Sequence, residues 1–304
     1  MLDDLKNLFK GNHFVGQMIV INASIFIVVN LIAHLVLGGN ERAILEWLAL
    51  PASITEFIWV PWSIISYMFL HGGLWHVVFN MYMLYWFGRI FGDFMGDKRL
   101  TGLYFLGGIS GGLLYMLAYN LFYLAGEPTN SMILVGSSAA VMAITVAAGM
   151  RFPDYIVNLL FFGAVKLKYV ALVIFLLSTV IDFSSNMGGK LAHLGGAAMG
   201  YFYIRGLEKG NDYALSFYNL YERFINLFQK SPKLKVVPND FAKQKKEKRS
   251  SFFGGTTESK SKSASDLKET QAKTDAILDK ISKSGYENLS KEEKEFLFKL
   301  SKNK

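Results

Sequence analysis

Six long apolar runs, separated by polar connections, constrain this chain more than any other feature of its sequence. They cover residues 17–37, 74–91, 100–124, 132–150, 169–181 and 190–204. A helix needs about 20 consecutive apolar residues to cross the hydrocarbon core of a bilayer. The chain is also 52% hydrophobic, which is more than a water-soluble domain of its size buries. We therefore predict an all-α polytopic membrane protein, a bundle of six transmembrane helices.

Basic residues are distributed unevenly over the connections between these runs. They precede the first run (Lys6, Lys10) and follow the second, fourth and sixth, whereas the connections after the first, third and fifth contain only Arg42. Lys and Arg favour the cytoplasmic side of a membrane. We predict a multi-pass protein with both termini in the cytoplasm, and expect the plasma (inner) membrane of a bacterium.

The predicted membrane domain covers residues 17–206 and follows a cytoplasmic N-terminus of residues 1–16. Residues 40–70 combine three tryptophans with two prolines and several charges, so we expect a first loop that lies in the membrane interface. Gly108 and Gly112 lie four residues apart in the third run. Small residues at this spacing predict close contact with another helix.

The tail differs in composition from the membrane domain. Residues 207–229 are rich in aromatic residues and predict an interfacial helix. Residues 230–270 form a basic flexible linker, whose cluster favours anionic lipid over nucleic acid: Lys243, Lys245, Lys246, Lys248 and Arg249. Residues 271–304 predict a small helical hairpin. Three apolar residues can lie on one face of its first helix: Ile277, Leu278 and Ile281. Ser290 and Glu293 predict a capping box at the start of its second helix.

Polar side chains inside the apolar runs are costly and therefore predict a functional site. His76 and Asn80 are four residues apart on one face of the second helix. Ser138 lies about two turns into the fourth predicted helix, and His193 lies in the first turn of the sixth. In the predicted topology all of these helices enter from the outside, so the four residues share a shallow depth beneath the outer surface.

These residue types fit nucleophilic catalysis. A serine hydroxyl becomes a nucleophile when a base takes its proton, and imidazole is the usual base near neutral pH. Gly196 and Gly200 follow His193 and can pack on the alanines after Ser138, which would bring the base to the serine. No carboxylate has an obvious place as a third member, so we predict a Ser–His dyad. The His76 and Asn80 side chains and the small residue Gly136 suit an oxyanion site.

Three other interpretations of these residues stay open. The small residues around Ser138 also suit plain helix packing with the hydroxyls bonded to their own backbone. A transporter would use the same polar groups as ligands, but the halves of the chain show no convincing repeat. Metal binding by His71, His76 and His193 lacks a carboxylate or thiolate partner, and the chain has no cysteine, so we predict no metal and no cofactor.

At these residues the chain resembles the rhomboid family of intramembrane serine proteases, over residues 15–206. The family's His-x-x-x-Asn pattern stands at His76 and Asn80, and its Gly-x-Ser pattern at Gly136 and Ser138. The sixth run carries the family's histidine, His193, before its glycines. This chain departs from the family at Ala139, where a glycine is usual, and at Met142, where many members have tyrosine.

The resemblance implies a serine endopeptidase in which Ser138 is the nucleophile and His193 the general base. His76 and Asn80, with the Ser138 backbone N–H, would hold the oxyanion. The partners would be transmembrane protein substrates, cut near the extracytoplasmic end of a transmembrane helix, and the lipid bilayer. A proteolytically inactive homologue that binds or escorts transmembrane helices is the alternative, although both the nucleophile and the base are present in this sequence.

Overall fold

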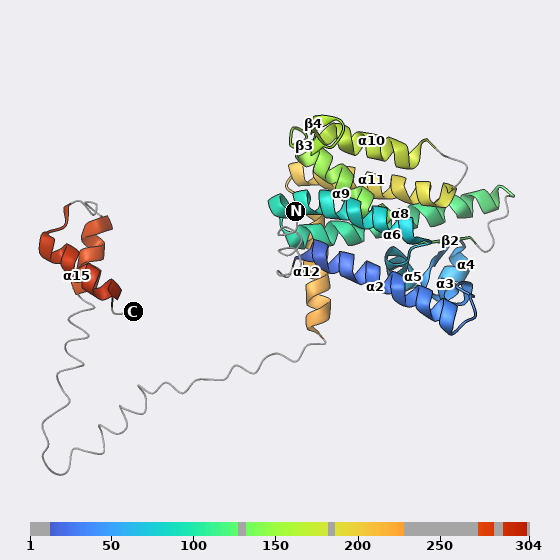
Figure 1. Cartoon of the computed structure of the whole chain (residues 1–304), viewed down its shortest axis with the longest axis horizontal. Coiled ribbons are helices and arrows are strands. Elements are labelled where there is room, and N and C mark those ends of the chain that lie inside the picture. The colour runs from blue at the N-terminus through green and yellow to red at the C-terminus, as the bar shows by residue number, and fades with distance from the viewer. Residues whose placement is uncertain (1–12, 127–131, 182–185, 228–272, 283–287, 303–304) are drawn as a thin grey trace, which may run out of the picture. The chain divides into compact units, whose positions relative to one another are not determined.

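The computed structural model of the chain describes residues 13–126, 132–181, 186–227, 273–282 and 288–302. Its contacts divide the chain into two compact units, Met1–Ser231 and Pro232–Lys304. Figure 1 shows the first unit as a helical bundle with short strands at its edges. The basic cluster predicted between residues 230 and 270 lies outside the described residues.

Each of the six apolar runs contains helix. Among the described residues, two helices are long and apolar enough to cross a membrane by length and composition, α2 (Phe14–Leu35) and α8 (Asp97–Leu124). α9 (Ser138–Arg151) and α10 (Leu167–Thr179) are apolar but shorter. The other two runs fold as α11 (Met187–Glu208) and as the continuous series α6 (Leu74–Met83), the π-helical turn η2 (Leu84–Gly88) and α7 (Arg89–Met95).

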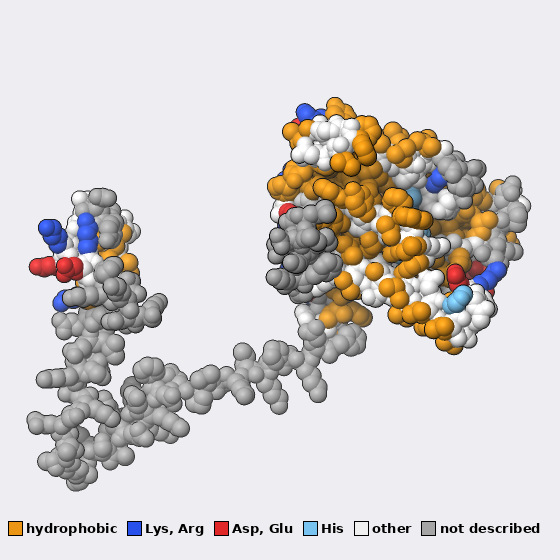
Figure 2. Space-filling view, in the orientation of Figure 1, with side chains coloured by type: hydrophobic (Ala, Val, Ile, Leu, Met, Phe, Trp, Pro, Cys, Tyr) orange, Lys and Arg blue, Asp and Glu red, His pale blue; other side chains and the backbone are white. Residues whose placement is uncertain are grey.

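Hydrophobic side chains cover much of the visible face of the bundle (Figure 2). Exposed apolar residues of this kind are expected on a surface that faces lipid rather than water. A helical membrane protein is therefore supported, whereas the number of six separate spans remains a prediction. The reason is geometric: α9 and α10 have 14 and 13 residues, fewer than the length that crosses a standard bilayer unaided.

Helices α8, α9 and α11 form the centre of the bundle (Figure 1). Small residues let their backbones approach closely. A side chain at Gly107 of α8 would overlap Ala143 of α9, and one at Gly111 would overlap Ala139. Packing of this kind needs glycine on one helix and alanine on the other, which the sequence supplies at a spacing of four residues.

The predicted close contact at Gly108 and Gly112 is present, but with short helical turns of the first loop and not with another long helix of the bundle. A side chain at Gly108 would meet Met68, and one at Gly112 would meet Leu50 and lie 2.8 Å from its Cδ2. Both partners belong to the first loop, so this face of α8 receives the loop. The helix contacts use the glycines one position earlier, because a step of one residue turns the helix by about 100°.

The first loop consists of short helical turns and one strand: α3 (Arg42–Leu48), β1 (Leu50–Pro51), α4 (Ile54–Phe57), α5 (Ser63–Ser66) and the 3₁₀ turn η1 (Tyr67–Phe69). β1 pairs antiparallel with β2 (Ile133–Leu134). Trp47, Trp59 and Trp62 are 48% to 81% exposed, as aromatic residues of an interfacial loop would be.

A β-hairpin joins α9 to α10, where the sequence analysis assigned no strands. β3 (Ile156–Leu159) pairs antiparallel with β4 (Gly163–Lys166), and Leu159 lies opposite Gly163. Lys166 and Lys168 both contact the Asp154 carboxylate, at 2.8 and 3.4 Å. These ion pairs hold the base of the hairpin at the ends of the two helices.

The predicted helix within residues 207–229 is present as α12 (Tyr213–Asn226), and it packs on the beginning of α8. Asp212 caps it by accepting from the Leu215 N–H at 3.0 Å, and also binds Arg99 Nε at 2.6 Å. Lys98 and Glu222 add a second ion pair, at 3.5 Å. Its location at a membrane interface remains a prediction.

In the second unit, residues 273–282 form one helix and α15 (Lys291–Lys302) another. The capping box is confirmed: the Ser290 N–H donates to Glu293 Oε2 at 2.7 Å, and the Glu293 N–H donates to Ser290 Oγ at 3.2 Å. The shared face is only partly confirmed, because Ile277 is buried while Leu278 is 52% exposed. Consecutive residues on a helix point about 100° apart, and Ile277 takes the inner position.

Candidate active site

Ser138 is the first residue of α9 and directly follows a tight turn. Gly136 in this turn has a φ of +129°, and its N–H donates to the Tyr67 carbonyl at 2.9 Å. The expectation that Ser138 lies two turns into a helix is wrong. Residues 133 and 134 pair with the first loop as strand β2, so that α9 begins only at Ser138.

The two neighbouring serines have different surroundings. Ser137 is fully buried, and its Oγ lies 3.1 Å from Nε2 of His71. Ser138 is only partly buried, so its hydroxyl is the accessible one of the pair. Although Ser137 occupies the N-cap position, its side chain makes no cap hydrogen bond. The first N–H groups of a helix have no intrahelical acceptor, so those of α9 lie at the site as hydrogen-bond donors.

Ala139 needs no glycine-like backbone in this structure. It lies within α9, in helical conformation, and its methyl group fills the space beside Gly111 of α8. The residue that requires glycine is Gly136, whose φ is in the left-handed half of conformational space. Met142, the second departure from the family pattern, is buried in the bundle.

His193 lies in the second turn of α11, because this helix begins at Met187, earlier than predicted. Its Nδ1 is 3.1 Å from the Ser178 carbonyl oxygen on α10. A carbonyl oxygen only accepts hydrogen bonds, so Nδ1 must carry the hydrogen and Nε2 of the neutral ring is left as the base. This partner could not be predicted from the sequence, because a main-chain carbonyl leaves no trace in the residue type.

The predicted packing of α11 on α9 is confirmed. A side chain at Gly196 would overlap the carbonyl of Ala139, and one at Gly200 would overlap the carbonyl of Ala143. Gly111 of α8 touches both helices, since a side chain there would meet Ala139 and lie 2.7 Å from the carbonyl oxygen of Ala192. One glycine thus contacts the residue after Ser138 and the residue before His193.

His76 lies on the other side of the turn at Gly136. A Cβ atom on Gly136 would lie 2.9 Å from both Cε1 and Nε2 of His76 and 3.5 Å from Ser138 Oγ. The imidazole and the serine hydroxyl therefore flank the same point. The Gly72 N–H donates to His76 Nδ1 at 3.4 Å, so the neutral ring carries its hydrogen on Nε2, the nitrogen that faces Gly136.

Asn80 lies one turn below His76 on α6 and is largely buried. Its Nδ2 donates to the His76 carbonyl at 2.8 Å, a bond within its own helix. A side-chain amide has two N–H donors, so this bond does not exhaust its capacity. Asn80 supports the helix segment that carries His76.

The described residues contain no group of three or more His, Cys, Asp or Glu side chains placed to hold a metal ion. Asp182, a carboxylate eleven residues before His193 in the sequence, lies outside the described residues. His71 and His76 pack edge to face, with their ring centroids 5.1 Å apart. His71 instead bonds Ser137, as expected of a residue that orients its loop.

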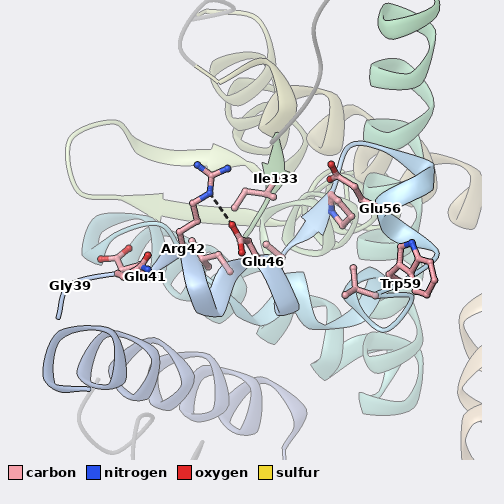
Figure 3. A pocket seen from close by; sticks show the side chains of 12 residues that line it. Gly39, Glu41, Arg42, Glu46, Glu56, Trp59 and Ile133 are labelled. Carbon is pink, nitrogen blue, oxygen red and sulfur yellow. Dashed lines mark hydrogen bonds and ion pairs between the residues drawn. The ribbon is translucent and has the colours of Figure 1, made fainter. Parts of the chain in front are cut away.

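A cavity of about 790 Å³ lies in the first loop (Figure 3), and neither Ser138 nor His193 lines it. Three glutamates, Glu41, Glu46 and Glu56, line it together with Arg42, and Ile133 of β2 forms part of its wall. Arg42 pairs with Glu46 at 3.2 Å. The cavity is therefore separate from the group of residues around Gly136.

Comparisons with known proteins identify related sequences for both parts of the chain. A family model described as "Rhomboid domain" matches residues 59–209, a range that includes Ser138, His193, His76 and Asn80. A family of unknown function (DUF6576) matches residues 262–303. RHOMBOID-like protein 12, mitochondrial, of Arabidopsis thaliana is 29% identical over 161 residues. That alignment covers 49% of this chain and 47% of the plant protein, so the chain spans about half the length of the curated relative it matches.

Proposed function

Because the chain belongs to the rhomboid family through its rhomboid domain at residues 59–209, we propose that it is an intramembrane serine endopeptidase. It cleaves transmembrane segments of other membrane proteins. Ser138 is the nucleophile and His193 the general base of a Ser–His dyad. No cofactor or metal takes part.

In the proposed reaction Ser138 Oγ attacks the scissile carbonyl carbon while His193 Nε2 takes the hydroxyl proton. The acyl-enzyme forms when the protonated His193 gives that proton to the leaving amine. Water then attacks the ester, again with His193 as base, and releases the carboxylate product and free Ser138. The bond from His193 Nδ1 to the Ser178 carbonyl supports this role, because it keeps the basic nitrogen on the opposite edge of the ring.

The tetrahedral intermediate carries a negative oxygen that needs hydrogen-bond donors. We assign this role to the Ser138 backbone N–H and to His76 Nε2–H, with Asn80 beside them. The tautomer of His76 supports the assignment, since its Nδ1 accepts from the Gly72 N–H. The two histidines would thus present opposite chemistry: His76 donates a hydrogen bond and His193 accepts a proton.

The observation that carries the proposal is the convergence of three separate helices on Gly136 and Gly111. Ser138 and His76 flank Gly136, and Gly111 touches the neighbours of Ser138 and His193. Plain helix packing explains the small residues. It gives no reason for two partly buried imidazoles with opposite tautomers beside a partly buried serine.

The proposed topology has six membrane-crossing segments, both termini in the cytoplasm, and the site near the outer surface. Substrates are then cut near their extracytoplasmic end. From the sequence we expected a bacterial plasma membrane, whereas the matched plant relative carries a mitochondrial name. In either membrane, the distribution of basic residues over the connections predicts that the site opens on the side opposite to the two termini.

The test is labelling of the reconstituted full chain by a fluorophosphonate probe, together with cleavage of a reporter transmembrane segment. Wild type should be labelled and should cleave. Ser138→Ala should lose both, and His193→Ala should lose cleavage, with melting temperatures in detergent close to that of wild type. Ser216→Ala, at an exposed position of α12, is the matched control and should keep both labelling and cleavage.

Cleavage that survives in Ser138→Ala or His193→Ala would contradict the dyad. A folded wild-type protein that neither reacts with the probe nor cleaves any reporter would instead favour the alternative, an inactive protein that binds or escorts transmembrane helices. Binding of the reporter segment without cleavage would then be its positive sign.

A further inference from the structure

The hairpin between α9 and α10 presents an unusual loop. Its strands close a loop of three residues, Leu160, Phe161 and Phe162, because Leu159 pairs with Gly163. Gly163, the first residue of β4, has a φ of +68°, a left-handed conformation that glycine adopts readily. The backbone therefore follows ordinary turn chemistry, and only the three side chains depart from it.

Turns of this kind usually carry Gly, Asn, Asp or Ser. Here the three loop residues are large and apolar, and the bundle does not cover them: Leu160 is 90% exposed, Phe161 87% and Phe162 80%. Neither the turn geometry nor packing within the described chain accounts for them. Large apolar side chains that are contiguous and fully presented mark a contact with something outside the chain.

The location of the hairpin identifies that contact. It starts where α9 ends and leads directly into α10, at the same end of the bundle as α12 (Figure 1). In the proposed topology this is the cytoplasmic end. The outward residues of α10, among them Leu172 and Val173, are half exposed and apolar, so the lipid-facing surface continues along the helix that the hairpin precedes.

The residues that flank the loop fit a lipid headgroup region. Lys166 and Lys168 hold the Asp154 carboxylate between them, and Tyr155 and Tyr169 are exposed next to these charges. Tyrosine and lysine at the base of an apolar segment are typical of the membrane–water interface. Figure 2 shows basic side chains beside hydrophobic ones at this end of the bundle.

We propose that the β3–β4 hairpin is a membrane-inserting finger. Leu160, Phe161 and Phe162 enter the acyl-chain region of the cytoplasmic leaflet, and Lys166 and Lys168 stay at the level of its phosphates. Three side chains are too few for a specific protein interface, which buries about 1,200–2,000 Å² in total, whereas they suffice to dip into a bilayer. The proposal rests on the proposed topology only for the identity of the leaflet.

The chain has no cysteine, so single-cysteine variants of the full protein can be labelled at chosen positions. Phe161→Cys reports on the loop. Asn158→Cys, exposed on β3, is the control within the same hairpin, and Leu172→Cys on α10 is the reference for lipid exposure. Each variant carries an environment-sensitive fluorophore and is reconstituted into phosphatidylcholine–phosphatidylglycerol vesicles, with and without brominated acyl chains.

The label at position 161 should emit at shorter wavelength than the label at position 158. Brominated lipid should quench it nearly as strongly as the label at position 172, and aqueous iodide should quench it weakly. Equal iodide quenching at positions 161 and 158 would place the loop in water and overturn the proposal. Protection from both quenchers would mean that protein covers the loop, which also overturns it. Neither readout depends on proteolysis.

Discussion

Substitution of Gly136 by alanine tests the geometry of the site most directly. The added Cβ would lie 2.9 Å from two atoms of the His76 ring and 3.5 Å from Ser138 Oγ. Real Cβ atoms do not approach other heavy atoms to 2.9 Å, so the imidazole or the turn must move. The backbone is also strained, because φ is +129° at this residue.

Gly136→Ala should lower the free energy of unfolding in two ways. A non-glycine residue in such a backbone conformation costs about 1–3 kcal/mol. Insertion of a methyl group into a packed site costs about 1–3 kcal/mol more. If the His76 ring turns away, the site loses one oxyanion donor, and losses of this type lower kcat about 10²–10³-fold. We therefore expect Gly136→Ala to lower kcat far more than it raises KM, together with a lower melting temperature.

The assay is cleavage of a reporter transmembrane segment in vesicles, with kcat and KM measured separately. Gly73→Ala is the matched control, since a Cβ at Gly73 meets nothing within 4 Å and its φ of 169° is ordinary extended backbone. This variant should keep wild-type kinetics. Wild-type kcat in Gly136→Ala, or an equal loss in Gly73→Ala, would refute the assigned position of His76.

Three further predictions concern other contacts. Gly196→Ala should lower the free energy of unfolding by about 1–3 kcal/mol and abolish cleavage, because the added methyl group pushes α11 away from the α9 backbone that Gly196 touches. Ser137→Ala removes the hydrogen bond to His71 and should lower the free energy of unfolding by about 0.5–1.5 kcal/mol. The probe should also label Ser138 more slowly in this variant. The pKa of Glu293 lies below its ordinary value, because the Ser290 backbone N–H and then a lysine ammonium bind the carboxylate. The Glu293 carboxylate therefore stabilises α15 at pH values above its pKa in the unfolded chain. This stabilisation is lost as the pH falls through the pKa of Glu293 in the folded chain, so hydrogen exchange of the α15 amides should become less protected there.

A specific result would contradict each of these three predictions. Wild-type cleavage in Gly196→Ala would mean that α9 and α11 tolerate separation at the site. Faster labelling in Ser137→Ala than in the Ser216→Ala control would mean that the bond to His71 restrains the nucleophile rather than holds it in place. Glu293→Gln keeps a hydrogen-bond acceptor but no titration, so unchanged acid sensitivity of α15 in this variant would assign the pH dependence to another group.

The apolar runs and the site residues could be read from the sequence. Hydrophobic length predicts helices because a helix is the only short segment that satisfies all its own backbone groups in lipid. Ser138, His193 and His76 stand out because polar groups in such runs are costly unless they serve a purpose. The spacing of Gly196 and Gly200 further predicted the contact of α11 with Ala139 and Ala143, since spacing alone fixes which residues share a helical face.

Other features depended on where distant segments meet. Residues 133 and 134 form a strand only because Leu50 and Pro51 lie beside them, and this pairing moved the start of α9 to Ser138. Gly107 and Gly111, not Gly108 and Gly112, face α9, because the rotation of a helix about its axis is set by its neighbours. The exposure of Phe161 likewise follows from the path of the hairpin away from the bundle.

The sequence by itself determined which residues are candidates for the chemistry and the order of the helices that bear them. The tertiary structure decided the tautomer of His193, because the Ser178 carbonyl oxygen on α10 binds its Nδ1. A local bond sets the tautomer of His76, because the N–H of Gly72, four residues earlier, donates to its Nδ1. Every residue has that carbonyl, and every residue except proline has that N–H. No residue type therefore indicates these bonds. The approach of α10 to α11 creates the bond to His193, and the backbone turn just before α6 creates the bond to His76.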